Sequence, residues 1–248
     1  MYKLPQKLTL VAALTLALAS LARAEDAPAP PKPDNEVSFN AAITSDYRYR
    51  GLSQTRLKPA LQGGMDYTNN PTGLYAGTWL STIKWTKDLG GDGEVEWDIY
   101  GGKRGEFAPG WSYDIGGLYY AYPSNGLHPN ANTFELYGQV GYGPAYVKYS
   151  GSTTNLFGTA DSKNSGYLDI GANFEMDPGL VLNVHMGRQI VKNNGAFSYN
   201  DYKVGVTKDF GVVSVSLSII GTDTDSYLSP GGKNLGKTAA VLAVSKTF

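Results

Sequence analysis

From Val37 to the end of the chain, apolar and polar side chains alternate along segments of about nine to fourteen residues. Successive side chains of a β-strand point to opposite faces, so this pattern predicts strands with one apolar and one polar face. Strands of soluble proteins average ~5–6 residues, whereas a tilted strand that crosses a membrane needs ~9–11. We count twelve such segments, at roughly 37–50, 59–68, 73–86, 94–104, 111–122, 132–142, 144–151, 165–176, 179–190, 200–209, 211–221 and 236–248.

The connections between these segments alternate in length. Long links follow the odd-numbered segments, at 51–58, 87–93, 123–131, 152–164, 191–199 and 222–235. Most links after even-numbered segments are short, such as NNPT at 69–72 and MDPG at 176–179. Bacterial outer-membrane barrels have an even number of strands, long external loops and short periplasmic turns. Residues 37–248 are therefore predicted to form an all-β, transmembrane, antiparallel up-and-down β-barrel of about twelve strands, with both termini on the periplasmic side.

One face of each predicted strand is expected to contact lipid. Because lipid offers no hydrogen-bond partners to the backbone, the first and last strands must pair and close the ring. We expect the first strand to turn its apolar face outward from Val37 through Tyr47 and Tyr49. The third is expected to do the same with Tyr75, Gly77, Trp79, Ile83 and Trp85. The chain holds 31 Gly and 18 Tyr, and this Gly content of about 12% exceeds the usual ~7%, which suits twisted strands and aromatic girdles.

The first 24 residues have the features of a secretory signal peptide. Lys3 and Lys7 precede an uncharged apolar stretch, and Ala22-Arg23-Ala24 is a typical cleavage site. Residues 1–24 are therefore expected to be removed, which places the protein outside the cytoplasm. Residues 25–36, EDAPAPPKPDNE, are rich in Pro and acidic side chains and predict a disordered leader. No apolar run long enough for a membrane helix follows the signal peptide.

Charge and cysteine content exclude several function classes. Removal of the signal peptide takes away three positive charges, so the formal charge falls from −1 to −4. A mildly acidic chain without a basic patch is not expected to bind nucleic acid. There are no cysteines, so neither disulfides nor thiolate metal sites can form. The sequence carries no pattern that specifies an oligomeric state.

The polar face carries both signs of charge, as expected of a water-filled lumen. We expect the following side chains to line the pore: Asp46, Arg48, Arg50, Lys84, Glu94, Glu96, Asp98, Asp114, Glu135 and Lys148. Asp66, Arg104, Asp169, Glu175, His185 and Lys203 share this inward face. One interpretation is a constriction that selects solutes by charge. In the other, the charges pair across the lumen and plug it. Arg48 and Arg50 either attract anions or are neutralised by Glu96, Asp98 or Asp114.

Two motifs resemble a known family. The segment TSDYRYRGLSQT, Thr44 to Thr55, is similar to the first-strand motif of the TorF-type porins, a proteobacterial outer-membrane family. The terminal Phe248 resembles the carboxy-terminal aromatic residue that outer-membrane barrels present to their assembly machinery. The resemblance implies a porin-like channel in the bacterial outer membrane. It would pass small hydrophilic solutes or ions by passive or facilitated diffusion.

Catalytic and metal-binding patterns are weak. An outer-membrane hydrolase needs a Ser–His arrangement or an acidic pair with a His, yet the chain has only His128, in a predicted loop, and His185, predicted to point inward. Asp88, Asp92 and the DTD run at 223–225 do not match a calcium loop. We expect no enzyme activity, no cofactor and no metal. The alternatives are a plugged barrel that binds a partner through its external loops and, less favoured, a hydrolase.

Overall fold

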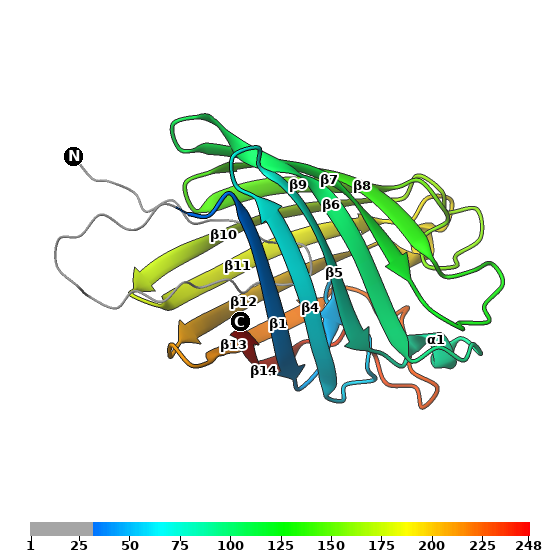
Figure 1. The fold of residues 1–248 in the computed structure, drawn as a ribbon. Coiled ribbons are helices and arrows are strands. Elements are labelled where there is room, and N and C mark those ends of the chain that lie inside the picture. Colours follow the sequence, from blue (N-terminus) through cyan, green and yellow to red (C-terminus); the bar gives the residue numbers. More distant parts are fainter. Residues whose placement is uncertain (1–31) are drawn as a thin grey trace.

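The structure is a computed structural model that describes residues 32–248 (Figure 1). The expected signal peptide, 1–24, lies outside the described residues, and so does the expected leader up to residue 31. The first strand, β1, begins at Asn35, so the last two residues assigned to the leader belong to the barrel. Among the described residues, no helix is long and apolar enough to cross a membrane.

Twelve antiparallel strands form a closed barrel, as the alternation predicts. They are β1 (Asn35–Thr44), β4 (Ala60–Asn69), β5 (Leu74–Thr82), β6 (Val95–Ala108), β7 (Trp111–Ala121), β8 (Thr133–Tyr142), β9 (Ala145–Ser152), β10 (Gly166–Asp177), β11 (Leu180–Ile190), β12 (Tyr199–Asp209), β13 (Ser214–Thr222) and β14 (Ala239–Thr247). A short hairpin of β2 (Arg48–Tyr49) and β3 (Leu52–Ser53) forms a separate small sheet. The helices are α1 (Trp85–Asp88) and the 3-10 turn η1 (Gly195–Phe197).

Pairing of the first and last strands closes the ring. β1 pairs with β14 from Asn40 opposite Thr247 to Thr44 opposite Ala243. The backbone N–H of Phe248 donates to the Phe39 carbonyl at 2.8 Å, and the Phe39 N–H donates back to the Phe248 carbonyl at 3.2 Å. No sheet edge is left within the wall, which satisfies the requirement that lipid imposes on the backbone.

The loops alternate in length as expected. The long ones span 45–59, 83–94, 122–132, 153–165, 191–198 and 223–238 and gather at one end of the barrel, on the right in Figure 1. The short turns span 70–73, 109–110, 143–144, 178–179 and 210–213 and lie at the other end. We call the end with the long loops the loop end and the opposite one the turn end.

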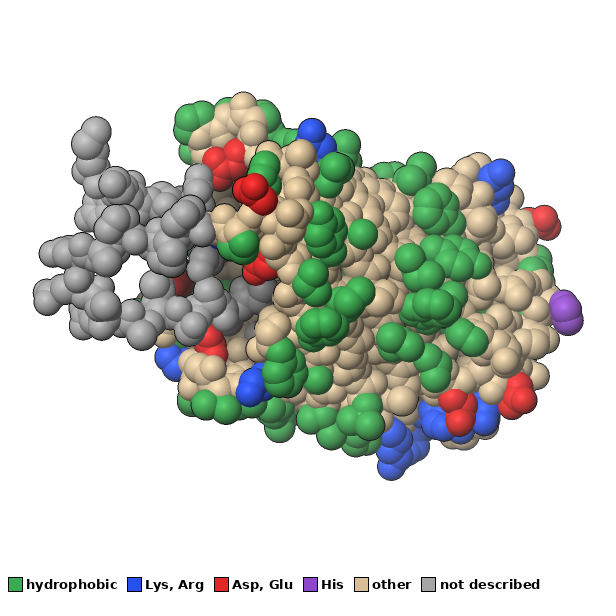
Figure 2. Space-filling model, viewed as in Figure 1, with side chains coloured by type: hydrophobic (Ala, Val, Ile, Leu, Met, Phe, Trp, Pro, Cys, Tyr) green, Lys and Arg blue, Asp and Glu red, His purple; other side chains and the backbone are tan. Residues whose placement is uncertain are grey.

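The outer wall is apolar. Exposed aliphatic and aromatic side chains lie along every strand of the barrel, among them Val37, Phe39, Ile43, Leu61, Leu80, Trp97, Ile99, Ile115, Leu136, Val147, Ile170, Met186, Val204, Leu217 and Leu242. Figure 2 shows hydrophobic side chains across the middle of the visible wall and charged side chains gathered near the two ends. This distribution matches a strand wall that faces hydrocarbon between two polar interfaces.

The predicted facing of the third segment is wrong. Tyr75, Trp79 and Ile83 are buried inside the barrel, at 8%, 2% and 0% exposure, while Leu74 and Leu80 are exposed. The register pairs Trp79 with the inward Asp98 of β6, and paired residues of neighbouring strands share a face. Both faces of β5 carry apolar side chains, so alternation alone does not orient it. The aromatic face turns inward because the lumen contains an apolar cluster of its own.

This lumen cluster lies towards the loop end. Its buried members are Tyr47, Ala60, Trp79, Ile83, Leu118, Tyr120, Tyr122 and Ala131. Six partly buried side chains pack against it: Tyr49, Trp85, Tyr100, Leu127, Tyr137 and Phe157. The barrel interior is therefore not uniformly polar. One half holds packed aromatic rings, which rigidify the end where the long loops meet.

Tyrosine rings on the inner wall lie directly over glycines of neighbouring strands. A Cβ added to Gly187 of β11 would lie 2.0 Å from the Tyr167 hydroxyl of β10. A Cβ added to Gly171 of β10 would lie 2.5 Å from the Tyr146 hydroxyl of β9. Only glycine leaves room for these rings to lie flat against the wall. The high Gly and Tyr contents thus serve the lumen as well as the interfaces.

Candidate functional site: the lumen and its inserted hairpin

The first predicted strand stops six residues early. β1 ends at Thr44, and residues 45–59 fold into the barrel, carrying the β2–β3 hairpin with them (Figure 1). Tyr47 is consequently buried in the lumen cluster and Tyr49 packs against it, whereas both were expected to face lipid. Tyr49 pairs with Leu52, and the residues between them, Arg50 and Gly51, have positive φ values of 46° and 80°. This is the backbone geometry of a tight two-residue hairpin turn.

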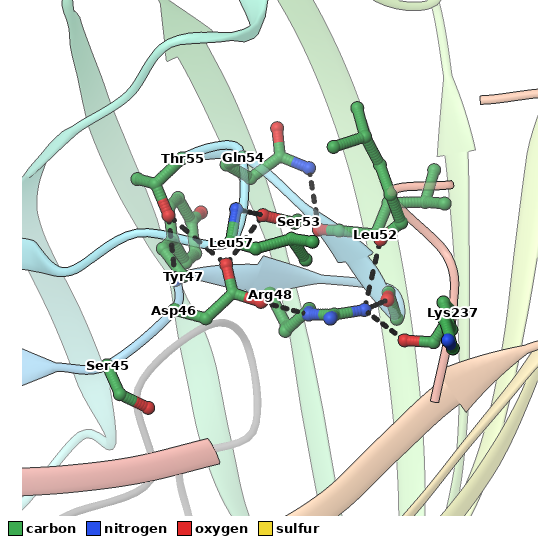
Figure 3. A network of polar contacts seen from close by, with 12 residues as sticks. Ser45, Asp46, Tyr47, Arg48, Leu52, Ser53, Gln54, Thr55, Leu57 and Lys237 are labelled. Carbon is green, nitrogen blue, oxygen red and sulfur yellow. Dashed lines mark hydrogen bonds and ion pairs between the residues drawn. The ribbon is translucent and has the colours of Figure 1, made fainter. Parts of the chain in front are cut away.

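Asp46 organises the base of the hairpin. Its Oδ1 accepts hydrogen bonds from the Ser53 hydroxyl at 2.5 Å and the Thr55 hydroxyl at 3.2 Å (Figure 3). Its Oδ2 accepts a charge-assisted hydrogen bond from Arg48 Nε at 2.5 Å. Asp46 is buried, and an unpaired carboxylate there would be costly. The carboxylate therefore holds the two arms of the hairpin together.

Arg48 fastens the hairpin to the last long loop. Its Nη1 donates to the carbonyls of Gly51 at 2.9 Å, Leu235 at 3.0 Å and Lys237 at 3.1 Å (Figure 3). The Arg48 side chain is only 2% exposed. Its charge is balanced by Asp46, which replaces the partners expected for it, Glu96, Asp98 or Asp114. Arg48 is thus largely a structural residue.

Arg50 fixes the hairpin tip to the opposite wall. Its guanidinium donates two hydrogen bonds to Glu135 of β8, at 2.7 and 3.0 Å, and a third to Gln189 of β11 at 2.7 Å. It also lies 4.2 Å above the centre of the Tyr167 ring. Bidentate arginine–carboxylate pairs are among the stronger polar contacts in proteins. The pair bridges the lumen from the hairpin to β8.

A cavity of about 210 Å³ lies in the lumen beside the hairpin tip. Four ionisable side chains of the wall line it besides the Arg50–Glu135 pair: Lys148, Asp169, His185 and Lys203. The Nζ atom of Lys148 also lies 3.9 Å from the centre of the Tyr137 ring. These positions lie on β8 to β12, so one arc of the wall carries acidic and basic side chains side by side. The expected inward facing of Lys148, Asp169, His185 and Lys203 agrees with this arrangement.

His185 sits between two carboxylates of neighbouring strands. Its Nδ1 lies 2.8 Å from Asp169 Oδ1 and its Nε2 lies 2.9 Å from Asp201 Oδ1. Tyr146 and Tyr167 donate their hydroxyls to the same two carboxylates. Both ring nitrogens of His185 therefore lie against carboxylates, whereas in a hydrolase triad one of the two lies against a serine.

The acidic residues Glu96, Asp98 and Asp114 of β6 and β7 lie inward as expected, and tyrosines bind two of them. Glu96 accepts hydrogen bonds from Tyr47 at 2.5 Å and Tyr122 at 2.8 Å. Asp114 accepts one from Tyr75 at 2.6 Å. Asp98 is 2% exposed and lies on the same face as Glu96. Glu96 and Asp98 are thus buried beside the lumen cluster and do not themselves line the 210 Å³ cavity.

Lys84 and Glu94 do not line the lumen. Both lie in the 83–94 loop, beyond the ends of β5 and β6, where they form an ion pair with each other. Lys87 lies 3.0 Å from the same carboxylate. The two lysines lower the pKa of Glu94 to about 2. The predicted segments 73–86 and 94–104 run beyond the ends of β5 and β6, so the prediction that Lys84 and Glu94 face the lumen is wrong.

Several residues of the site were not singled out from sequence. Asp201 has the same strand parity as the inward Lys203, so periodicity contained the signal. Gln189 and the tyrosine hydroxyls carry no charge and resemble ordinary wall residues in sequence. The described part of the chain gathers no three His, Cys, Asp or Glu side chains in an arrangement that could hold a metal ion.

Comparison with known proteins places this architecture in context. A family model described as "Bacterial protein of unknown function (Gcw_chp)" matches residues 28–248. The solved structure of the KdgM porin is similar to the chain with a TM-score of 0.54 at 5% identity, covering 86% of this chain and 97% of that one. The NanC porin gives a TM-score of 0.55 at 8% identity, covering 86% and 98%. No curated protein matches the sequence. At these identities the likeness concerns the fold, a closed twelve-stranded barrel resembling these porins.

Proposed function

The chain belongs to the Gcw_chp family of bacterial proteins of unknown function, and we propose that it is a narrow outer-membrane channel for small hydrophilic solutes or ions. The observation that carries this proposal is the charged cavity inside a closed, apolar-walled barrel. Its fold resembles that of two proteins named as porins. In this proposal the signal peptide directs export and Phe248 engages the barrel-assembly machinery.

The inserted hairpin is the constriction of the proposed channel. Its tip, Arg50, reaches Glu135 on the far wall and narrows the lumen to a cavity of about 210 Å³. Pockets for drug-sized ligands are larger, at ~300–1,000 Å³. Passage would therefore be limited to small solutes, with Lys148, Lys203, Asp169 and the Arg50–Glu135 pair setting the field along the path.

The resemblance to the TorF-type porins rests on this same hairpin. The motif TSDYRYRGLSQT covers the end of β1 and nearly the whole inserted segment. Its Asp46, Arg48 and Arg50 are the residues that hold the hairpin closed and fix it to the wall. The position of these three residues supports the proposal that the chain is a porin whose motif forms the constriction.

A plugged barrel is the second candidate, and one observation favours it. The lumen cluster and the hairpin fill the loop end with packed rings, such as Tyr47 against Trp79 at 5.4 Å between ring centres. Eight-stranded barrels are filled in a comparable way. In that case the protein would act through its external loops.

Single-channel recording in planar bilayers separates the two. The wild-type protein should give small, discrete conductance steps. Replacement of residues 47–57 by a short Gly-Ser link should give larger steps, because it removes the hairpin from the lumen. The matched control is the same replacement at the exposed segment 230–233, which should conduct like the wild type. Heat-dependent gel mobility would show that each barrel is folded. A folded wild-type protein that stays silent refutes the channel.

A further inference from the structure

A second cavity, of about 340 Å³, lies at the loop end, where the start of β4 and the end of β5 meet the last long loop. We call it the basic pocket. Among the described residues, its lining includes no acidic side chain but four basic ones: Arg56, Lys58, Lys84 and Lys233. They come from three separate segments of the chain, so the sequence shows no basic run and only the fold gathers them.

The basic pocket adjoins the apolar outer wall. Thr82, which lines the pocket, lies on the outward face of β5 together with Leu80, and both are exposed. The Thr82 hydroxyl accepts a hydrogen bond from the backbone N–H of Leu61 at 3.2 Å, and Leu61 is itself 64% exposed. Figure 2 shows Lys and Arg side chains, with acidic ones among them, at the lower right, where the apolar wall ends. A group bound in the pocket can therefore carry an apolar chain that lies on the wall.

Two of the four cations have no acidic partner. Arg56 and Lys84 each pair with a carboxylate that lies outside the pocket lining. Within the described residues, the ammonium groups of Lys58 and Lys233 make neither an ion pair nor a hydrogen bond. The pocket thus holds two uncompensated positive charges in a protein whose formal net charge is −1.

Hydrogen-bonded turns support both of these lysines. Leu57, directly before Lys58, has a φ of 62°, and its N–H donates to the Ser53 hydroxyl at 2.8 Å. Lys233 closes a turn with Ser229: its N–H donates to the Ser229 hydroxyl at 3.1 Å, and its carbonyl accepts from the Ser229 N–H at 2.9 Å. Because the backbone already fixes the origin of each side chain, less ordering is needed when the two ammonium groups bind an anion.

Two lysines on fixed supports match a doubly charged anion. A phosphate monoester carries about −1.5 to −2 charges near pH 7 and has three strong acceptor oxygens, whereas a phosphodiester has a single negative charge. Basic pockets at a membrane surface attract anionic lipid headgroups. A phosphorylated lipid would satisfy both surfaces at once, with its phosphate in the pocket and its acyl chains on Leu61 and Leu80. A soluble anion would contact the pocket alone.

We propose that the basic pocket binds the phosphate monoester of a membrane lipid from the leaflet around the loop end. Lys58 and Lys233 contact the phosphate oxygens, and the acyl chains lie along the outer faces of β4 and β5. The inference rests on the membrane placement in the proposed function but not on conduction, since a plugged barrel would carry the same site.

Native mass spectrometry of the protein in detergent tests the proposal with two lipids that have the same acyl chains. Dioleoyl phosphatidic acid carries a monoester and dioleoyl phosphatidylglycerol a diester. We expect the wild type to retain one phosphatidic acid molecule several-fold more tightly than phosphatidylglycerol. Lys58→Gln combined with Lys233→Gln should weaken phosphatidic acid about 25-fold, because each lysine at a membrane surface strengthens binding of an anionic lipid about fivefold.

The matched control is Lys163→Gln combined with Lys192→Gln. It removes the same charge from two exposed lysines of the long loops that do not line the pocket, so it should bind phosphatidic acid like the wild type. Heat-dependent gel mobility checks that each variant is folded. Equal retention of the two lipids by the wild type, or equal losses in the two double variants, overturns the proposal.

A third probe separates a lipid from a soluble phosphate compound. Glycerol 3-phosphate has the monoester but no acyl chains, so it should not displace phosphatidic acid at equal concentration. Displacement would assign the pocket to a soluble anion and overturn the lipid as its occupant. Bilayer recordings are independent of this result: a silent barrel that binds phosphatidic acid refutes the channel alone, and a conducting barrel that does not bind it refutes the lipid site alone.

Discussion

Glu135→Met should release the hairpin from the far wall. The Arg50 and Glu135 side chains are 7% and 3% exposed, and two hydrogen bonds join them. Breaking a buried ion pair by altering one partner costs ~3–5 kcal/mol. Arg50 keeps its contacts with Gln189 and the Tyr167 ring, so we expect the lower end, about 3 kcal/mol. The equilibrium constant that favours the hairpin bound to the wall over the released hairpin would then fall by a factor of about 10².

The measurement combines stability with conduction. Glu135→Met and Arg50→Met should each lower the midpoint of urea unfolding in detergent and produce noisy, larger conductance steps. The double variant should lose no more stability than either single variant, because it leaves no unpaired charge buried. The coupling energy of this double-mutant cycle should be about 3 kcal/mol. Additive effects, with no coupling, would show that the pair does not hold the hairpin.

Three further outcomes are expected. Gly187→Val should prevent correct folding, because its side chain would occupy the position of the Tyr167 ring, and the folded band in heat-modifiability gels reports this. If the cavity conducts, Lys203→Gln should shift the reversal potential in a salt gradient towards cations, since it removes one positive charge from the cavity wall, and an unchanged potential would place Lys203 off the path. The pKa of Glu94 is depressed to about 2, so its pairing with Lys84 is fully present above pH ~4.5 and is lost as the pH falls through about 2; an ordinary Glu titration curve by NMR would contradict it.

The alternation of apolar and polar side chains predicted the barrel, because each strand of a wall between lipid and lumen must turn apolar side chains to one face and polar ones to the other. Twelve strands, the alternating loop lengths and the outward face of β6, from Val95 to Ile99, all follow from that rule. It fails where both faces accept apolar side chains. On β5 Tyr75 and Trp79 face the lumen while Leu74 and Leu80 lie on the outer wall, so only the pairing register decides the orientation.

The site was harder to predict than the wall. Arg48 and Arg50 were recognised as inward charges, but not as parts of a hairpin, because the alternation continues past Thr44, where β1 ends, as far as Arg50. Their partners are set by the three-dimensional course of the chain: Asp46 is two residues from Arg48, whereas Glu135 is 85 residues from Arg50. Long-range pairs of this kind leave no spacing signal in a single sequence.

The seam between β1 and β14 is the shorter of the two pairings that β1 makes. β1 pairs with β4 over its whole length, from Asn35 to Thr44, but with β14 only from Asn40 to Thr44, helped by Phe39 and Phe248. Every other strand of the barrel is already paired on both sides. Removal of β14 would therefore leave two unpaired strand edges that no other strand of the barrel is free to cover.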